Sequence, residues 1–137
     1  MVDDQRAEAR LGRLEETIER LDEVWAGGRD AYLADANLRA MTERLLEVAI
    51  QICIDLGAQI VAELSAPAPA DYAGIFKILA EKGLLEGDLA GRMGDAARQR
   101  NLLVHLYMEV DDSAVFDSLM YLDDLRRFAS FAGQRIG

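Results

Sequence analysis

The sequence predicts an all-α fold, an antiparallel helical bundle of four main helices plus a short one. Apolar residues recur at spacings of three and four almost throughout, which is the period of an amphipathic helix. No stretch alternates apolar and polar residues over a length useful for a strand. The chain has 137 residues, of which 51% are hydrophobic and 29% charged, as in one packed domain. We therefore expect a single helical domain over residues 1–137.

The first predicted helix carries a single apolar stripe with a charged opposite face. The stripe consists of Leu11, Leu14, Ile18, Leu21 and Trp25. Gly27 and Gly28 follow its last member, and glycines in that position commonly end a helix. Residues 29–34 form a connector, either irregular or a short helical turn.

The second predicted helix is the longest, over about residues 35–64, and has two apolar faces. One face carries Leu38, Met41, Leu45, Val48 and Ile52, and the other carries Ile50, Ile54, Val61 and Leu64. Burial on both sides means that this helix is either central in the bundle or also packed against another subunit. The segment of residues 65–69 contains both prolines of the chain and predicts an inter-helix loop.

A short third helix is predicted over residues 72–82, with Asp71 as its N-cap. We expect Ile75, Phe76 and Leu79 to point inward and Gly83 to end the helix. A fourth helix runs from residue 86 or 87 to about residue 106. Its interior contains Gly91 and Gly94, each of which costs roughly 1 kcal/mol relative to alanine.

A fifth helix is predicted to begin near residue 112 or 113. Its inner stripe consists of Val115, Leu119, Leu122 and Leu125.

Charge and composition exclude several classes of function. The formal net charge is -10, from 15 Lys and Arg against 25 Asp and Glu, which argues against a general nucleic-acid binder. The single cysteine, Cys53, excludes an intramolecular disulfide, and its apolar surroundings predict an inert buried thiol. One histidine excludes a multi-histidine metal site within one chain. We expect neither a metal nor another cofactor.

The N-terminus is polar and acidic, without the apolar region of a signal peptide. No apolar run approaches the roughly 20 residues that span a bilayer. We therefore expect a cytoplasmic protein without a membrane partner.

Charge is distributed unevenly near the C-terminal half. Residues 109–124 contain six acids and no Lys or Arg, whereas residues 91–101 contain three arginines and one acid. The overall charge therefore leaves room for one small basic cleft.

The only histidine lies in a dense polar segment over residues 98–107. Asn101 and His105 are four residues apart and share a helix face, which Arg98 borders. Arg100 and Tyr107, seven residues apart, share another face. Arg100 and His105 are roughly 140° apart on an ideal helix, so they converge only through the long arginine, a bent helix end or a second subunit. Spacing alone favours a structural interpretation, in which the histidine stabilises the helix C-terminus and Arg100 is a surface charge.

The pattern Arg100-Asn101-x-x-x-His105-x-Tyr107 resembles the R-x4-H-x-Y signature of the HEPN superfamily, and more narrowly the HepT-like ribonuclease toxins, a DUF86 family. The resemblance covers roughly residues 10–130. Further matching positions are Tyr72, Phe76 and Leu79, then Gly83, Leu84 and Leu85, then the acidic segment of residues 109–116. The sequence departs from the family at Leu102, often basic there, and at Arg98 and Gln99, where Gly or an aromatic residue is frequent. Leu102 weakens the local positive field, and Arg98 restores part of it.

The resemblance implies a metal-independent endoribonuclease that acts on RNA as a homodimer. It implies His105 as the acid/base, since an imidazole exchanges protons at neutral pH. Arg100 is the implied phosphate-binding residue, because its planar fork matches two phosphate oxygens. Asn101 is implied to orient the imidazole or bind the phosphate, and Arg98 is a possible RNA-binding residue. Both motifs line an interface cleft in such dimers, which would bring Arg100 and His105 together.

The resemblance also implies a protein partner. HepT-like toxins are encoded beside a minimal nucleotidyltransferase (MNT) antitoxin, which transfers AMP to the motif tyrosine. Tyr107 is the corresponding residue here. The added bulk and negative charge would occupy the place of an RNA phosphate.

Two alternatives remain open from the sequence. The chain could be a non-catalytic HEPN interaction module that partners a minimal nucleotidyltransferase, or a helical structural subunit without a site. The acidic composition is compatible with the non-catalytic module, because an acidic protein should have weak general affinity for RNA.

Overall fold

The computed structural model describes residues 4–136, which are mostly helical and contain no β-strand. Residues 1–3 and 137 of the predicted domain lie outside this range. The helices are α1 (Asp4–Gly27), α2 (Arg29–Ala34), α3 (Ala36–Ala62), α4 (Tyr72–Glu81), α5 (Gly87–His105), α6 (Asp112–Ser118) and α7 (Leu122–Arg135), with 3-10 turns η1 (Tyr107–Glu109) and η2 (Leu119–Tyr121). The predicted all-α bundle is confirmed, with α1, α3, α5 and α7 as its long members.

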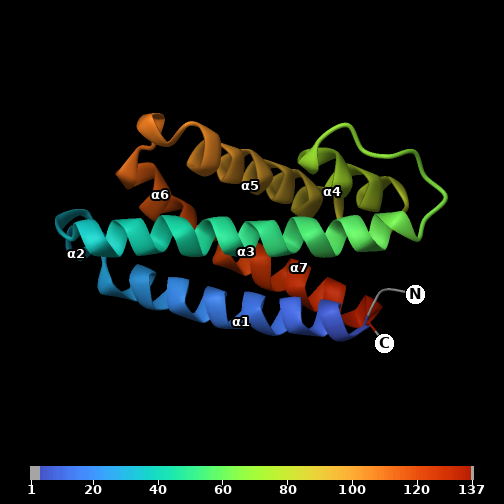
Figure 1. The fold of residues 1–137 in the computed structure, drawn as a ribbon, viewed down its shortest axis with the longest axis horizontal. Coiled ribbons are helices and arrows are strands. Elements are labelled where there is room, and N and C mark those ends of the chain that lie inside the picture. The colour runs from blue at the N-terminus through green and yellow to red at the C-terminus, as the bar shows by residue number, and fades with distance from the viewer. Residues whose placement is uncertain (1–3, 137) are drawn as a thin grey trace.

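Helix α3 is the central element of the bundle. Figure 1 shows α1 and α7 on one side of α3, and α4 and α5 on the other. Most residues of both predicted apolar stripes are accordingly buried, although Met41 is 36% exposed. The bundle itself therefore accounts for both faces of α3, and a second subunit is not needed to cover them.

Helix α3 is also long and apolar enough, by length and composition, to cross a membrane. Of its most apolar 18-residue window, however, 61% is buried inside the bundle. This is the burial of a core helix, because a spanning helix would present that surface to lipid. Cys53 lies on α3 and is completely buried. Burial raises the pKa of its thiol, as expected for an inert cysteine.

The first helix ends where the glycines predict, and the connector proves to be helical. Gly28 has a φ of +89°, which glycine adopts without a steric penalty. The chain then forms the six-residue helix α2, whose Tyr32 has no exposed surface. Burial, with the nearby Asp112 carboxylate, raises the pKa of Tyr32 to about 12.

Helix α4 follows the prediction closely. The Asp71 carboxylate accepts a 2.8 Å hydrogen bond from the backbone N–H of Gly74, so Asp71 is the N-cap. Ile75, Phe76 and Leu79 are all buried. Helix α4 is thus fixed by a cap at its start and by apolar contacts along one face.

The single fifth helix of the prediction is wrong in detail, because the segment is divided into α6, η2 and α7. Ser118 Oγ donates a 2.6 Å hydrogen bond to the carbonyl oxygen of Val115, and such back-bonding often bends a helix. The chain tightens into a 3-10 turn directly afterwards. All four predicted inner residues are nevertheless buried: Val115, Leu119, Leu122 and Leu125.

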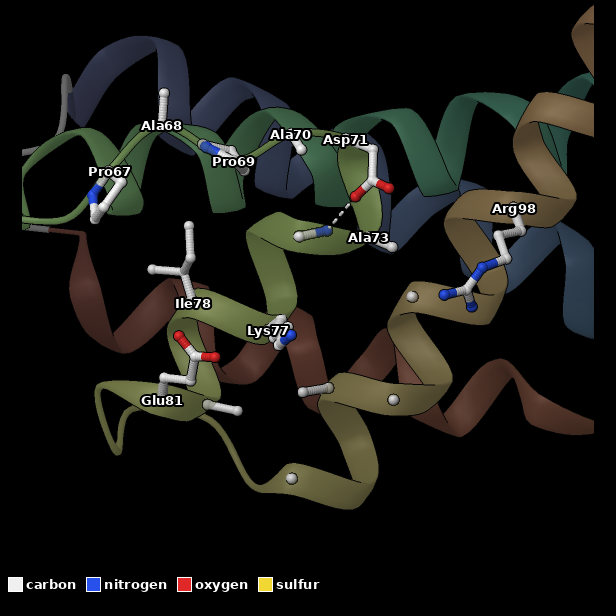
Figure 2. A pocket seen from close by; sticks show the side chains of 16 residues that line it. Pro67, Ala68, Pro69, Ala70, Asp71, Ala73, Lys77, Ile78, Glu81 and Arg98 are labelled. Atoms are coloured by element: carbon white, nitrogen blue, oxygen red, sulfur yellow. Dashed lines mark hydrogen bonds between the residues drawn. The ribbon is translucent and has the colours of Figure 1, made fainter.

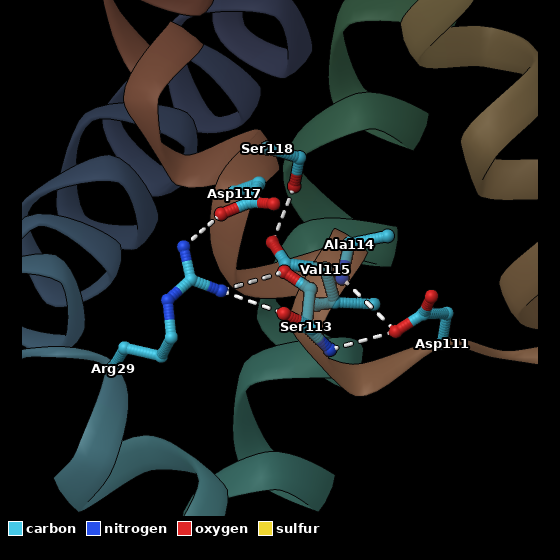
Figure 3. A network of polar contacts seen from close by, with 7 residues as sticks. All are labelled: Arg29, Asp111, Ser113, Ala114, Val115, Asp117 and Ser118. Carbon is cyan, nitrogen blue, oxygen red and sulfur yellow. Dashed lines mark hydrogen bonds and ion pairs between the residues drawn. The ribbon is translucent and has the colours of Figure 1, made fainter.

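Arg29 fastens α6 to the start of α2 (Figure 3). Its guanidinium donates a 2.7 Å hydrogen bond to Ser113 Oγ, forms an ion pair with Asp117 and lies 5.2 Å from the centre of the Phe116 ring. Arg39 adds an ion pair to Asp112 at 3.4 Å. These contacts hold the far end of the segment that connects α5 to α6.

Candidate functional site

The candidate motif lies across the C-terminal end of α5. His105 is the last residue of the helix, and Leu106, with φ −122° and ψ 41°, leaves helical geometry. Its backbone N–H still donates a 2.9 Å hydrogen bond to the carbonyl oxygen of Leu102. Tyr107 then opens the 3-10 turn η1. The helix therefore ends within the motif, between its histidine and its tyrosine.

Arg100 is held between two neighbouring side chains. Its Nη1 donates a 3.2 Å hydrogen bond to Asn101 Oδ1, and its guanidinium carbon lies 5.6 Å from the centre of the Tyr72 ring, within cation–π range. Its Nε is buried and has no hydrogen-bond partner. The guanidinium is thus positioned, yet part of its donor capacity is unused.

His105 is exposed, and no hydrogen bond or ion pair joins it to another side chain of residues 4–136. It shares a helix face with Asn101, one turn earlier, as predicted. Within one chain the structure therefore brings Arg100 to Asn101 and leaves His105 unconnected to either.

The three arginines of residues 91–101 differ in their partners. Arg92 Nε lies 3.0 Å from both carboxylate oxygens of Asp124 on α7, and Arg98 Nη1 lies 2.7 Å from Asp95. Arg100 has no acidic partner in the part of the chain that the structure describes. Neighbouring carboxylates therefore offset the positive charges of Arg92 and Arg98, and Arg100 keeps its charge without such a partner.

A cavity of about 740 Å³ lies between the proline-containing loop, α4 and α5 (Figure 2). Its charged lining residues come from both helices and the loop: Asp71, Lys77, Glu81 and Arg98. On α5, residues 87, 91, 94 and 98 line the cavity. Their spacings of four and three place them on one helix face, which continues through residues 101 and 105. The face that borders the cavity therefore leads directly to Asn101 and His105.

Sequence reasoning assigned no role at the site to Tyr72 or Lys77. Tyr72 entered only as part of a family pattern, and Lys77 not at all. No helical spacing relates residues of α4 to residues of α5, so only the packing of the two helices reveals both positions.

The turn after α5 presents apolar side chains to solvent. Leu106 is 51% exposed, Tyr107 68% and Met108 86%. A protein that modifies a side chain needs this kind of access to it. Tyr107 is accessible in this sense, as the most exposed large hydrophobic residue of the described part of the chain after Met108.

Among residues 4–136, no group of three or more His, Cys, Asp or Glu side chains is placed to hold a metal ion. The chemistry that the site offers comes from a guanidinium, an amide, an imidazole and a phenol.

Comparison with known proteins gives one family and several related folds. The family model described as "Ribonuclease HepT-like" matches residues 14–132. The tRNA nuclease HepT of Aphanizomenon flos-aquae (strain 2012/KM1/D3) is 27% identical over 111 residues, which are 81% of this chain and 74% of that protein.

Two solved structures have nearly the same fold as this chain. One is a toxin–antitoxin complex with AMP-PNP, with a TM-score of 0.84, 21% identity and coverage of 96% of this chain and 99% of the other. The second is a tri-AMPylated Shewanella oneidensis HEPN toxin in complex with MNT antitoxin, with a TM-score of 0.84, 22% identity and coverage of 96% and 97%.

Proposed function

The chain belongs to the ribonuclease HepT-like family, and from that premise we propose that it is a metal-independent RNA endoribonuclease and the toxin of a toxin–antitoxin system. One observation carries the proposal. The half-buried Arg100, without an acidic partner in residues 4–136, is hydrogen-bonded to Asn101 one turn before the exposed His105. We place this activity in a single cytoplasmic domain over residues 1–137.

Each residue has a chemical role in this proposal. The His105 imidazole accepts the proton of the ribose 2′-OH as that oxygen attacks phosphorus. The resulting imidazolium returns a proton to the 5′ oxygen as its bond to phosphorus breaks. Arg100 binds two phosphate oxygens and stabilises the charge that develops on them. Asn101 keeps the guanidinium oriented through their 3.2 Å hydrogen bond.

The active enzyme in this proposal is a homodimer. Arg100 and His105 leave one helix in different directions and share no contact in the single chain. A second α5 across a two-fold axis would place the arginine of one chain beside the histidine of its partner. Mixing Arg100→Ala with His105→Ala protein tests this arrangement, because mixed dimers would regain one complete site. No recovery of cleavage in a mixture that exchanges subunits would contradict a shared site.

Tyr107 is the proposed site of modification by a minimal nucleotidyltransferase antitoxin. The name of the Shewanella neighbour records AMPylation of a toxin in complex with MNT antitoxin, and Tyr107 is 68% exposed here. Incubation with a minimal nucleotidyltransferase and ATP should add adenylyl mass to the wild type and not to Tyr107→Phe. The control is Tyr121→Phe, since Tyr121 is also exposed, at 58%. A gain that persists in Tyr107→Phe would refute the assignment.

RNA cleavage by purified protein tests the activity. Arg100→Ala and His105→Ala should abolish cleavage and the growth arrest that expression causes. Arg44→Ala should change neither, because Arg44 is an exposed arginine of α3 that pairs with Glu47. Equal cleavage by the wild type and His105→Ala would indicate a contaminating nuclease. That result would favour the non-catalytic module that partners a nucleotidyltransferase.

A further inference from the structure

We propose that Tyr72 is a base-stacking residue of the site, which holds an unpaired RNA nucleotide beside Arg100. This inference rests on the proposed ribonuclease function and narrows its substrate class to RNA with unpaired bases. It also assigns to the short helix α4 a direct part in binding.

The position of the Tyr72 ring suggests this role. Tyr72 is the first residue of α4, and its ring lies 5.6 Å from the Arg100 guanidinium carbon. Tyr72 nevertheless keeps 40% of its surface exposed. An exposed aromatic ring beside an arginine is the combination with which proteins bind single-stranded nucleic acids, by stacking on bases and pairing with phosphates.

The Tyr72 ring belongs to a helix, α4, that is firmly held in the fold. The Asp71 cap fixes the first turn of α4 through the 2.8 Å hydrogen bond to Gly74. Ile75, Phe76 and Leu79 anchor the helix in the core. A ring that is held in place before binding loses little conformational entropy when a base stacks on it.

The charge of the protein makes a stacking contribution valuable. With a net charge of -10, long-range attraction cannot supply general affinity for RNA. Stacking depends little on charge and accepts any base, so it can hold a nucleotide where few phosphate contacts exist. The cavity beside Asp71, with Lys77 and Arg98 in its lining, offers space for the neighbouring nucleotide.

Stacking on Tyr72 requires an unpaired base. In a duplex, the faces of each base are already covered by its neighbours, and the edges are paired. The Tyr72 contribution should therefore appear with single-stranded RNA and be absent with a duplex of the same sequence.

Binding is measured with His105→Ala protein, which keeps bound RNA intact, and a short single-stranded RNA that carries 2-aminopurine. We expect Tyr72→Leu to weaken binding about tenfold and to remove fluorescence quenching, because stacking contributes about 1–3 kcal/mol per base. Tyr72→Phe should restore binding to within about threefold of the parent, and Tyr72→Trp should strengthen it. Tyr121→Leu is the control, since Tyr121 is exposed and lies on the other side of α5.

Cleavage kinetics provide a second measurement. In the protein with His105, Tyr72→Leu should raise KM about tenfold for single-stranded RNA and lower kcat much less. Thermal unfolding shows whether Tyr72→Leu is folded. If it is not, Tyr72→Trp is compared with the parent protein instead, with stronger RNA binding as the expected result. Unchanged binding and KM in folded Tyr72→Leu, or an equal loss with duplex RNA, would overturn the stacking role.

The two proposals fail in different ways. Cleavage by the wild type with an unchanged KM in Tyr72→Leu would overturn only the role of Tyr72. Tyr72-dependent RNA binding without cleavage by the wild type would retain that role and refute the ribonuclease. Absence of any RNA binding would overturn both.

Discussion

Arg100 donates a 3.2 Å hydrogen bond from Nη1 to Asn101 Oδ1, although the two residues are adjacent on one helix. Neighbouring side chains leave an α-helix about 100° apart, so only the length of the arginine permits this contact. The amide oxygen of Asn101 therefore faces a cation that has no acidic partner in residues 4–136. This arrangement preserves the positive charge, which a carboxylate at the same position would cancel.

Asn101→Asp should lower kcat/KM for RNA cleavage about tenfold to a hundredfold. The new carboxylate would form an ion pair with Arg100 and repel the RNA phosphate that the arginine binds. Steady-state kinetics at fixed salt measure the effect. Asn37→Asp makes the same change in net charge at an exposed position of α3, and an equal loss there would indicate a general charge effect.

Substitution of Arg92 should affect the stability of the fold, whereas substitution of Arg98 should affect RNA binding. Arg92 joins α5 to α7 through Asp124, so Arg92→Met should lower the free energy of unfolding by about 1 kcal/mol. Its RNA affinity per folded molecule should not change. Arg98 borders the cavity with an exposed, local ion pair to Asp95, so Arg98→Met should leave stability within about 0.5 kcal/mol.

RNA binding provides the reverse comparison for the same two variants. Arg98→Met should weaken affinity roughly threefold to tenfold at low salt, and less at high salt. Urea unfolding and fluorescence binding measure the two quantities. A loss of affinity with Arg92→Met alone would assign the basic site to the opposite side of α5.

Gly57→Ala should destabilise the protein by about 1–2 kcal/mol. A Cβ at Gly57 would lie 2.8 Å from Ile75 Cγ2, in the contact between α3 and α4. Overpacking of this kind outweighs the helix propensity that alanine adds. Gly12→Ala is the matched control, because a Cβ there meets nothing within 4 Å, and it should stabilise α1 by about 0.5–1 kcal/mol. A higher free energy of urea unfolding for Gly57→Ala than for the wild type would contradict this expectation. It would show that α3 and α4 move apart enough to accept the added methyl group.

Glu43→Gln should be more stable than the wild type at pH 7, and this advantage should shrink at pH 4. Burial first, and then the nearby Asp112 carboxylate, raise the pKa of Glu43, while Arg39 opposes the shift. The folded protein therefore holds this proton more tightly than the unfolded chain. The wild type loses that contribution as pH rises from about 4.5, the ordinary value of this carboxyl group, through the raised pKa.

The measurement is the melting temperature of both proteins from pH 4 to pH 7. The difference should be smallest at pH 4, where both side chains are neutral, and should grow with pH. Exposed Glu16→Gln on α1 serves as the control. A difference that stays constant with pH would show that the substitution acts through packing.

Local patterns were sufficient for most of the helices. Asp71 caps α4 as its residue type and position predict, and the buried face of α4 follows from helical spacing. On α1 the spacing correctly predicts the buried Leu14, Ile18 and Leu21, whereas Trp25 of the same stripe is 39% exposed. The division of the last helix was not predictable from spacing, because both arrangements bury Val115 and Leu119. Just before the division, Ser118 donates a hydrogen bond to the Val115 carbonyl oxygen, and a serine in a helix has other possible partners.

The helical bundle and the segment that carries the candidate chemistry can be predicted from the amino-acid order alone, since periodicity and a short motif are properties of neighbouring residues. Which groups meet follows only from how the helices pack. The packing pairs Arg92 with Asp124 and places Tyr72 against Arg100. Such contacts depend on the angle and offset at which whole helices pack, and these arise from the summed fit of many buried side chains. No local pattern in the sequence contains that sum.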